Sequence, residues 1–227
     1  QSGWSQKFSK KILNIPKHGC IGQHPAPLPV GRGAACVNWA ILLGYKKWGD
    51  SFFLMDEKYD NGDVVAQSFF LIDDDDTVKT VYDKVCYTTK KICEKEIANW
   101  SKGIFKRKKQ NLTKSIYFKK RAPSDGEIDL LNDSNIFAYN KIRALTRPYP
   151  GAFVMFNKKK ITIWEASKHS NIKNLPMFIS KKIFFLYKKI LFLKLGDKKN
   201  TFLKIKRLQV DNSPEFPGKD IAQFIKL

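Results

Sequence analysis

The sequence predicts an α/β domain followed by a small antiparallel β-barrel domain. Before Gly151, short apolar strands alternate with helices, whereas after it closely spaced strand-like runs are separated by turns. The chain has 227 residues, 43% of them hydrophobic, which suffices for a large domain and a small one. We therefore expect a first domain over residues 1–120, a linker and connecting helix over 121–150, and a second domain over 151–227.

The first domain is predicted to begin with a helix, a buried strand and a proline-rich loop. Apolar spacing indicates the helix over Ser5–Leu13, and Gly19–Gln23 is typical of a strand that leads into His24. Pro25-Ala26-Pro27-Leu28-Pro29 follows, and because each proline fixes φ and lacks an N–H we expect an extended, stiff loop. A compact helix should then run from Ala34 to Gly44.

Two strands and a long helix are expected to complete this domain. The strands span Asp50–Met55 and Asp63–Ile72 and are joined by a turn over Tyr59–Gly62. Asp73–Asp76 could bind a metal, but they precede an amphipathic helix that reaches Trp100, so capping of that helix is the favoured interpretation.

The C-terminal part is predicted to start with a helix from Ser134 to about Arg147, which Pro148 ends. The strand-like runs of the β-barrel domain are Phe153–Phe156, Ile161–Ala166, Ile183–Leu186, Ile190–Leu195 and Phe202–Leu208. Turns such as Asn157-Lys158 and Gly196-Asp197 separate them.

Charge and cysteine content restrict the classes of function. The formal charge of +21 could indicate a polyanionic partner such as nucleic acid, although a lysine-rich composition from an AT-rich genome explains it slightly better. A small anionic substrate such as a nucleotide would also fit. The four cysteines form no CxxC pair, so we expect no metal and no disulfide, with Cys86 and Cys93 as buried free thiols on one helix.

No leader or membrane segment is expected. Gln1-Ser-Gly-Trp4 has no basic region followed by an apolar one, and the apolar run Ile183–Leu195 is interrupted by Lys188 and Lys189. We therefore expect a cytoplasmic protein without a membrane partner.

His24 and Asp60 are the candidate catalytic residues. A stiff loop that holds His24 would suit a general base or a polarising group, although a lone histidine can equally be an ordinary hydrogen-bonding residue. Asp60-Asn61-Gly62-Asp63 has the Asn-Gly signal of a type I′ hairpin and lacks the further ligands of a calcium loop. A carboxylate at that turn could also orient an imidazole. Sequence spacing alone does not show whether the two residues meet.

Several motifs resemble those of the folate-dependent formyltransferases. The segment from Gly22-Gln-His24 to Arg32-Gly33 resembles the family signature Asn-x-His-x-Ser-Leu-Leu-Pro-x-x-Arg-Gly. The helix motif Val37–Gly44 follows it, and Met55-Asp-x-x-x-Asp60-x-Gly62-Asp63 through Gln67 is similar to the next family motif. Asn140–Phe153 resembles the join to the C-terminal domain. The resemblance covers almost the whole chain, in order and with compatible spacing.

The resemblance implies transfer of a formyl group from 10-formyltetrahydrofolate to a primary amine, without a metal. His24 would polarise the formyl carbonyl and assist proton transfer, and Asp60 would orient His24 and help to deprotonate the amine. The fold would be part of a Rossmann-like domain followed by an OB-like barrel. Contacts with the donor or acceptor are expected from Trp4, Gly22, Gln23, Pro25, Leu28, Pro29, Arg32, Gly33, Asn38, Asn61, Gly62 and Asp63.

The sequence departs from the family pattern in three places. Gly22 replaces the catalytic asparagine, Ala26 replaces the signature serine, and the βαβ units that normally precede the Gly3-Trp4 segment are missing. Loss of one oxyanion donor typically lowers a rate by about a hundredfold or more. We therefore expect weak or no activity from this polypeptide alone.

The acceptor could belong to either of two classes. Val37–Ile41 and Arg121-x-Pro-x-Asp125-Gly-x-Ile-Asp129 resemble sugar-nucleotide N-formyltransferases, which favours a nucleotide-linked amino sugar. The basic charge favours tRNA instead, as in methionyl-tRNA formyltransferase. An inactive fragment that serves as a binding module is the alternative of a different class, and a homodimer is possible.

Overall fold

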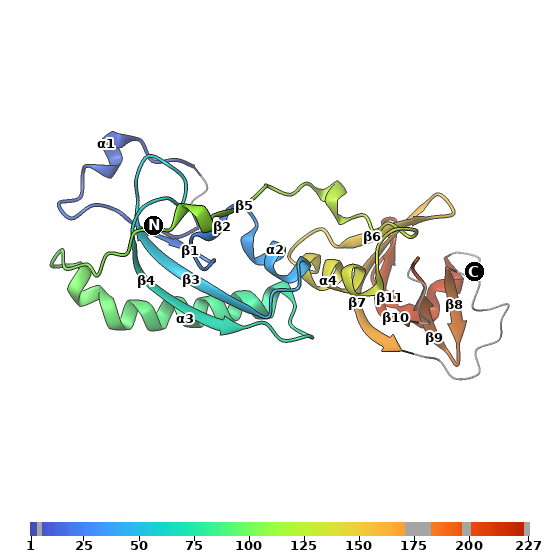
Figure 1. Ribbon diagram of the computed structural model, residues 1–227. Coiled ribbons are helices and arrows are strands. Elements are labelled where there is room, and N and C mark those ends of the chain that lie inside the picture. The colour runs from blue at the N-terminus through green and yellow to red at the C-terminus, as the bar shows by residue number, and fades with distance from the viewer. Residues whose placement is uncertain (4–5, 171–182, 197–200, 225–227) are drawn as a thin grey trace. The chain divides into compact units, whose positions relative to one another are not determined.

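The computed structural model describes residues 1–3, 6–170, 183–196 and 201–224 (Figure 1). Trp4, Ser5 and Asp197, which enter the predictions above, lie outside this set. The chain divides into two compact units, which are described separately here. Unit 1 comprises Gln1–Ala40, Gly44–Asp76 and Thr80–Arg121, and unit 2 comprises Ile41–Leu43, Thr77–Lys79 and Ala122–Leu227.

Unit 1 is built on an antiparallel sheet in the order β1-β3-β4, formed by β1 (Ile21–His24), β3 (Lys47–Leu54) and β4 (Val64–Leu71). Gly22 pairs with Phe53 and His24 with Ser51, so these side chains share one face of the sheet. A second, two-stranded sheet is formed by β2 (Val30–Gly33) and β5 (Ile116–Phe118), which pair in parallel. Along the chain, β2 precedes β3, and β5 follows the long helix.

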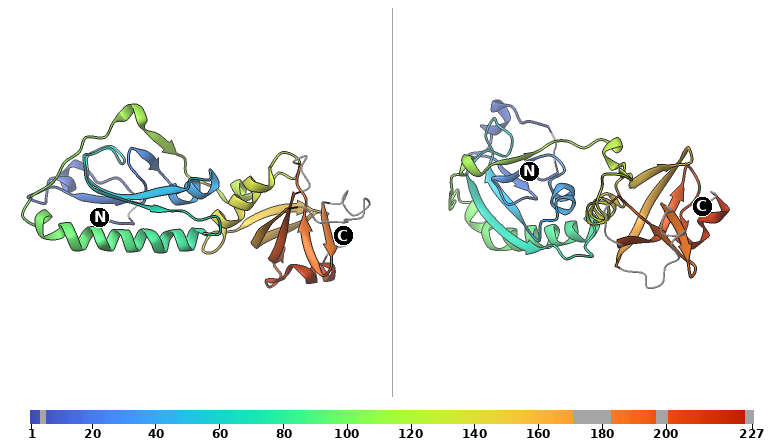
Figure 2. Two further views of the ribbon diagram at one scale, coloured as in Figure 1. Left: turned by 60° about the horizontal axis from the view of Figure 1, so that its bottom comes forward. Right: turned by 45° about the vertical axis from the view of Figure 1, so that its right-hand side comes forward.

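The long helix α3 (Val78–Trp100) packs on the opposite face of the sheet (Figures 1 and 2). Its Ile92 and Trp100 contact Phe52 and Val65, and burial of each such side chain stabilises the fold by about 1.5–3 kcal/mol. The buried positions Val81, Val85, Thr88 and Ile92 recur at helical spacing. Cys86 falls outside this stripe and is exposed, so its predicted burial is wrong.

Two of the four acidic residues before α3 pair with a lysine of unit 1. Asp76 accepts hydrogen bonds from the Asp73 N–H and the Thr80 hydroxyl, and Lys84 pairs with both Asp73 and Asp76. Burial would raise the pKa of Asp76, but its hydrogen bonds, above all that from Lys84, hold the pKa below its ordinary value.

The proline-rich segment is not the extended loop that the sequence predicts. The Ala26 N–H donates to the His24 carbonyl at 2.7 Å, the Leu28 N–H to the Ala26 carbonyl at 3.0 Å, and the Val30 N–H to the Pro27 carbonyl at 3.1 Å. The non-proline residues between the prolines retain their N–H groups, and these close successive tight turns. The segment therefore reverses the chain from β1 into β2.

The shorter helices are α1 (Lys10–Leu13), α2 (Cys36–Leu42) and α4 (Asn135–Leu145). Two of them, α2 and α4, begin and end within about two residues of their predicted limits, whereas α1 is shorter than predicted. The Ser134 hydroxyl caps α4 by accepting from the Phe137 N–H at 3.2 Å. Only the last turn of the predicted Ser5–Leu13 helix is described as α1, which Ser9 caps. No helix within the described ranges has the length and apolar character needed to cross a membrane.

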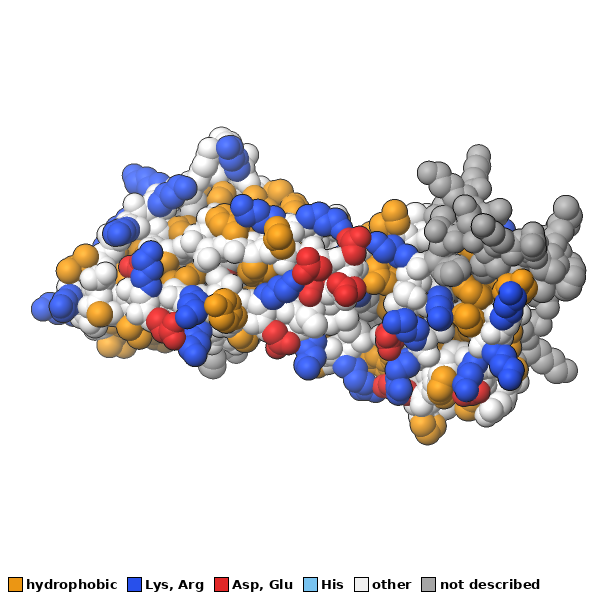
Figure 3. All heavy atoms as spheres, turned by 90° about the horizontal axis from the view of Figure 1, so that it is seen from below, with side chains coloured by type: hydrophobic (Ala, Val, Ile, Leu, Met, Phe, Trp, Pro, Cys, Tyr) orange, Lys and Arg blue, Asp and Glu red, His pale blue; other side chains and the backbone are white. Residues whose placement is uncertain are grey.

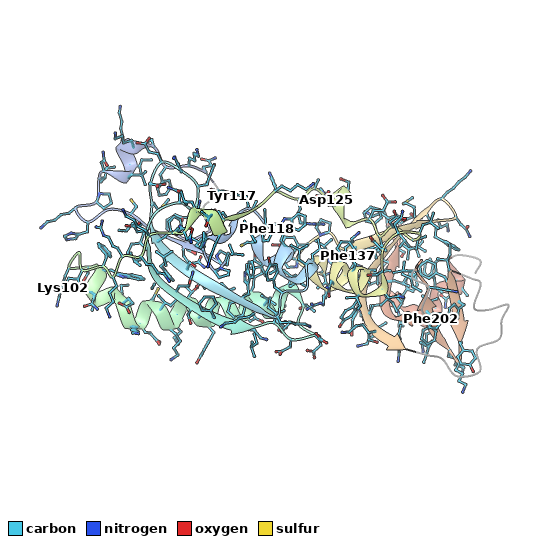
Figure 4. The ribbon with its side chains drawn as sticks, viewed as in Figure 1. Lys102, Tyr117, Phe118, Asp125, Phe137 and Phe202 are labelled. Carbon is cyan, nitrogen blue, oxygen red and sulfur yellow. The ribbon has the colours of Figure 1, made fainter. Side chains whose placement is uncertain are left out.

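Unit 2 is centred on an antiparallel sheet, which confirms the antiparallel strands predicted after Gly151. Its strands follow the order β6-β7-β10-β9-β8, and a short β11 pairs with β10. Phe185, Phe192 and Phe202 form an aromatic core cluster, and Phe202 is labelled in Figure 4. The bounds are β6 (Ala152–Phe156), β7 (Lys159–Ser170), β8 (Phe184–Tyr187), β9 (Ile190–Leu193), β10 (Thr201–Val210) and β11 (Phe216–Pro217).

Candidate active site

His24 lies at the end of β1 and is buried, with a side chain that is 11% exposed. Its Nε2 is 2.8 Å from the Gly31 carbonyl oxygen. Because a carbonyl can only accept a hydrogen bond, Nε2 carries the proton in this arrangement. The neutral ring therefore has its lone pair on Nδ1, which is the nitrogen available for proton transfer.

Asp60 faces this second nitrogen. Its Oδ1 lies 3.7 Å from His24 Nδ1, and its Oδ2 accepts a hydrogen bond of 2.8 Å from the Gly33 N–H. A separation of 3.7 Å is too long for a direct hydrogen bond, yet it is close enough for the carboxylate to stabilise positive charge on the ring. The structure thus brings together two residues whose contact the sequence could not show.

The loop that carries Asp60 has a strained and closely packed backbone. Asp60 has a φ of +52°, so the left-handed residue of this loop is Asp60 and not Asn61 or Gly62, as a type I′ Asn-Gly turn would require. A Cβ on Gly62 would lie 1.6 Å from the Leu54 carbonyl oxygen. Only glycine therefore fits at position 62 while the loop stays against β3.

Gln110 holds the same loop from a distant part of the chain. Its Nε2 donates to the carbonyl oxygens of Asp60 at 2.9 Å and Gly62 at 2.8 Å. Sequence patterns do not predict Gln110 as a site residue, because it lies in a basic and polar stretch after α3 that has no helical or strand periodicity.

Arg32 is buried, with 1% of its surface exposed, and its guanidinium is directed at this glutamine. Nε and Nη2 donate to Gln110 Oε1 at 3.1 and 2.6 Å, and Nη1 donates to the Tyr117 hydroxyl at 2.8 Å. Nη1 is also 3.4 Å from Asn61 Oδ1. Tyr117 is labelled in Figure 4, on β5 next to Phe118.

Two polar side chains of the sheet fix the turns that follow His24. The Ser51 hydroxyl donates to the Ala26 carbonyl at 2.6 Å and accepts from the Leu28 N–H at 3.1 Å. Gln67 Nε2 donates to the Leu28 carbonyl at 3.0 Å and to the Ser51 hydroxyl at 2.8 Å. Gln67 is the last residue of the Met55–Gln67 motif, and its role in the structure is to hold the turns that follow His24.

His24 and Asp60 open onto a cavity of about 980 Å³ within unit 1. Gly22 is not among its lining residues, whereas Gln23, Pro25, Gly33, Met55 and Phe118 are. Leu28 and Pro29 line a different and smaller cavity of about 300 Å³. Arg32 and Asn38 are buried outside both cavities, so direct ligand contacts from them stay predictions, as do those of Asn61, Gly62 and Asp63.

Gly22 lies under an aromatic ring. A Cβ at this position would be 2.8 and 2.9 Å from two ring carbons of Phe53 and 3.1 Å from Met55 Cγ. The space that an asparagine side chain would need on the His24 face is therefore filled by Phe53.

Gln23 points to the opposite face of β1, toward α3. Its Nε2 donates to Asp50 Oδ1, and the Thr89 hydroxyl donates to Asp50 Oδ2 at 2.6 Å. Burial raises the pKa of Asp50, which these two hydrogen bonds only partly offset. Burial likewise raises the pKa of the Cys36 thiol, to about 12, which disfavours the nucleophilic thiolate form of this cavity-lining cysteine.

Two protein-family models match successive parts of the chain. The sequence model described as formyl transferase matches residues 2–97, and the model described as formyl transferase, C-terminal domain, matches residues 120–224. The chain belongs to the formyltransferase family. Both His24 and Asp60 of this formyltransferase chain lie within the first match.

Curated relatives share a substantial part of the sequence. The formyltransferase chain is 39% identical over 159 residues to the bifunctional polymyxin resistance protein ArnA of Wigglesworthia glossinidia brevipalpis, which covers 70% of this chain and 24% of that protein. It is 34% identical over 161 residues to the methionyl-tRNA formyltransferase of Halothermothrix orenii, covering 71% and 50%. The chain thus matches between a quarter and a half of the length of these two relatives.

A solved structure shares the fold. HypX from Aquifex aeolicus in complex with tetrahydrofolic acid superposes with a TM-score of 0.69 at 21% identity, covering 91% of this chain and 35% of that one. The similarity spans both units, and it establishes the partial Rossmann-like domain followed by the OB-like antiparallel domain as the fold of this formyltransferase chain.

Proposed function

We propose that this chain contributes the catalytic pair of a formyltransferase that moves a formyl group from 10-formyltetrahydrofolate to a primary amine. The observation that carries the proposal is the 3.7 Å approach of His24 Nδ1 to Asp60 Oδ1 at the edge of a cavity of about 980 Å³. Family membership supports the reaction class, and the bound tetrahydrofolic acid of the HypX structure supports a folate donor.

His24 acts through Nδ1 in this proposal. The Gly31 carbonyl retains the proton on Nε2, so a protonated ring presents Nδ1–H as a donor to the formyl oxygen. That donor stabilises the negative charge that develops on the oxygen when the amine attacks. The Asp60 carboxylate stabilises the imidazolium while this occurs.

Asp60 has a second role in this proposal, which is to help to remove a proton from the amine. An amine attacks only as the neutral base, so its ammonium proton must first leave, and Asp60 or neutral His24 Nδ1 can accept it. The new bond joins the amine nitrogen to the formyl carbon. The bond from that carbon to N10 of the folate then breaks, and N10 takes a proton as tetrahydrofolate leaves.

The acceptor is proposed to be a nucleotide-linked amino sugar. The resemblance of the Arg121–Asp129 segment to the sugar-nucleotide enzymes supports this assignment. In the structure, the guanidinium of Arg121 lies 4.7 Å from the centre of the Trp39 ring, and Asp125 accepts from the Ala122 N–H at 2.8 Å. Arg121 and Asp125 of the motif are thus each held by a defined local contact, one within each unit.

The test is formyl transfer by the chain completed with the βαβ units that normally precede the Gly3-Trp4 segment, followed by mass spectrometry with a ¹³C-labelled formyl donor and an amino-sugar nucleotide as acceptor. We expect His24→Ala and Asp60→Asn each to lower the rate by about 10²–10⁴-fold, the usual contribution of a positioned acid or base. An unchanged rate in His24→Ala would remove this histidine from the mechanism. Rapid turnover by the unmodified chain would contradict the expectation of weak activity.

tRNA is the second candidate acceptor, and the charge of +21 favours it. Figure 3 shows Lys and Arg side chains spread over the visible face and interspersed with acidic ones, so the charge is not gathered there into a single basic patch. Formylation of methionyl-tRNA with a steep dependence on salt would establish this acceptor, because phosphate contacts release counterions.

A further inference from the structure

Both polar atoms of the Gln110 side-chain amide form hydrogen bonds, Nε2 with the Asp60 loop and Oε1 with Arg32. The two Nε2 hydrogens go to the carbonyls of Asp60 and Gly62, and Oε1 accepts two N–H groups of Arg32. A flipped amide would set NH₂ against guanidinium donors and oxygen against carbonyls. The partners therefore fix both the position and the orientation of this side chain.

Arg32 holds the side chain of Gln110 by donating two hydrogen bonds to its Oε1. The hydrogen-bond partners of Arg32 are neutral groups, namely the Gln110 amide oxygen, the Tyr117 hydroxyl and the Asn61 amide oxygen. Within the described residues, no carboxylate lies within ion-pair distance of its guanidinium. A buried guanidinium strengthens the hydrogen bonds it donates, so Arg32 holds Oε1 firmly and directs the NH₂ group of Gln110 toward the loop.

The loop needs such support because its backbone is strained at the residue that carries the carboxylate. Asp60 adopts a left-handed φ of +52°, which costs free energy for a residue with a side chain. The Nε2 group of Gln110 donates two hydrogen bonds, one to the carbonyl of Asp60 and one to that of Gly62, and both hold the strained backbone in place.

We propose that Gln110 is a positioning residue for formyl transfer, which holds the Asp60 carboxylate against His24, and that Arg32 acts through Gln110. The inference rests on the proposed function for its catalytic consequence, but the positioning itself can be measured separately. The Gly33 N–H serves as the reporter, because it donates to Asp60 Oδ2 at 2.8 Å and is protected from exchange while the carboxylate stays in place.

The decisive variant is Gln110→Glu. Glutamate preserves the size of the side chain and both acceptor contacts to Arg32, but it replaces the two N–H donors with an oxygen that faces two carbonyls. The matched control is Asn111→Asp, the same change of charge at the adjacent residue. Asn111 uses its Oδ1 as an acceptor from the Thr113 N–H at 3.1 Å, a contact that aspartate retains.

Amide hydrogen exchange tests the positioning without any turnover. We expect exchange at Gly33 to rise about tenfold or more in Gln110→Glu, toward the level of Asp60→Ala, and to stay unchanged in Asn111→Asp. Thermal unfolding of each variant controls for a general loss of stability. Unchanged exchange at Gly33 in Gln110→Glu overturns the proposal.

Kinetics then test the catalytic consequence. We expect Gln110→Glu to lower kcat by about 10–100-fold with little change in the KM of the donor, because a misplaced group costs rate more than binding. In an Asp60→Asn background, Gln110→Glu should cause no further loss of kcat. If Gln110 had a merely structural role, the losses of kcat from the two substitutions would multiply. If no amine is formylated even by a chain completed with the βαβ units that normally precede the Gly3-Trp4 segment, the proposed function fails, while the exchange experiment still decides the positioning role.

Discussion

Gly22 and Phe53 form a packed pair in which either residue limits the size of the other. Carbon atoms pack best at about 3.5–4.0 Å, so a Cβ at 2.8 Å from the Phe53 ring would be too close by about 0.7 Å. The ring cannot move freely, because Phe53 is 4% exposed and packs against Leu28 and Val64. Gly22→Ala must therefore strain this side of the sheet.

The expected magnitude follows from two opposing effects. Alanine is more favourable than glycine within a regular element by about 0.5–1 kcal/mol, whereas overpacking a core costs about 1–3 kcal/mol. We expect Gly22→Ala to lower the free energy of unfolding by about 1–2 kcal/mol. In a Phe53→Leu background the clash is relieved, so the same substitution should be neutral or slightly stabilising, with a coupling of about 1–3 kcal/mol.

Urea unfolding monitored by tryptophan fluorescence measures this coupling, since the chain has five tryptophans. The four proteins of the double-mutant cycle are the unmodified chain, Gly22→Ala, Phe53→Leu and the double variant. If the two substitutions are additive to within about 0.5 kcal/mol, the ring does not fill the space above Gly22 and the reasoning is refuted.

Three further predictions concern stability. Asp76→Asn should lower the free energy of unfolding by about 1.5–3 kcal/mol at pH 7 through loss of the charged hydrogen bond from Lys84. Because the pKa of Asp76 is depressed in the folded state, this difference should shrink as the pH falls below about 4, and an equal difference in urea unfolding at pH 7 and pH 3 would contradict it. Gly62→Ala should cost more than about 3 kcal/mol in thermal unfolding, because its Cβ would meet the Leu54 carbonyl at 1.6 Å; a normal melting temperature would show that the loop yields. Glu215 pairs with exposed arginines, and hydrogen bonding to Arg147 depresses its pKa, so Glu215→Gln should cost less than about 1 kcal/mol, and a larger loss that persists in high salt would be unexpected.

The elements that the sequence predicted are those with strong local signals. Ser134 before an apolar stripe predicted α4 and its cap, and the short apolar runs after Gly151 predicted strands that pair in the structure as β6, β7 and their neighbours. The long helix after Asp76 also followed from periodicity. Such signals arise from residues close together in the sequence, so they predict helices and strands without knowledge of tertiary contacts.

The parts that could not be predicted depend on contacts between distant residues. Nothing in the proline-rich segment shows that Ser51 would bind its carbonyl and amide groups and fold it into tight turns. Likewise, Gln110 lies in a lysine-rich stretch without periodicity, although it reaches the Asp60 loop. The resemblance to the family named His24 and Asp60, but only the structure shows their separation and the tautomer that the Gly31 carbonyl imposes.

The attachment of the His24 turns to the sheet has a consequence for how this region opens. Ser51 and Gln67 face each other across β3 and β4 and together bind Ala26 and Leu28, which lie 25 and 39 residues away along the chain. The turns therefore have little independent stability and cannot separate from the hairpin without breaking these bonds. Sub-global opening of the β3–β4 hairpin and exposure of the histidine should be one cooperative event, and the turns that follow His24 should be ordered late in folding, once the two strands have paired.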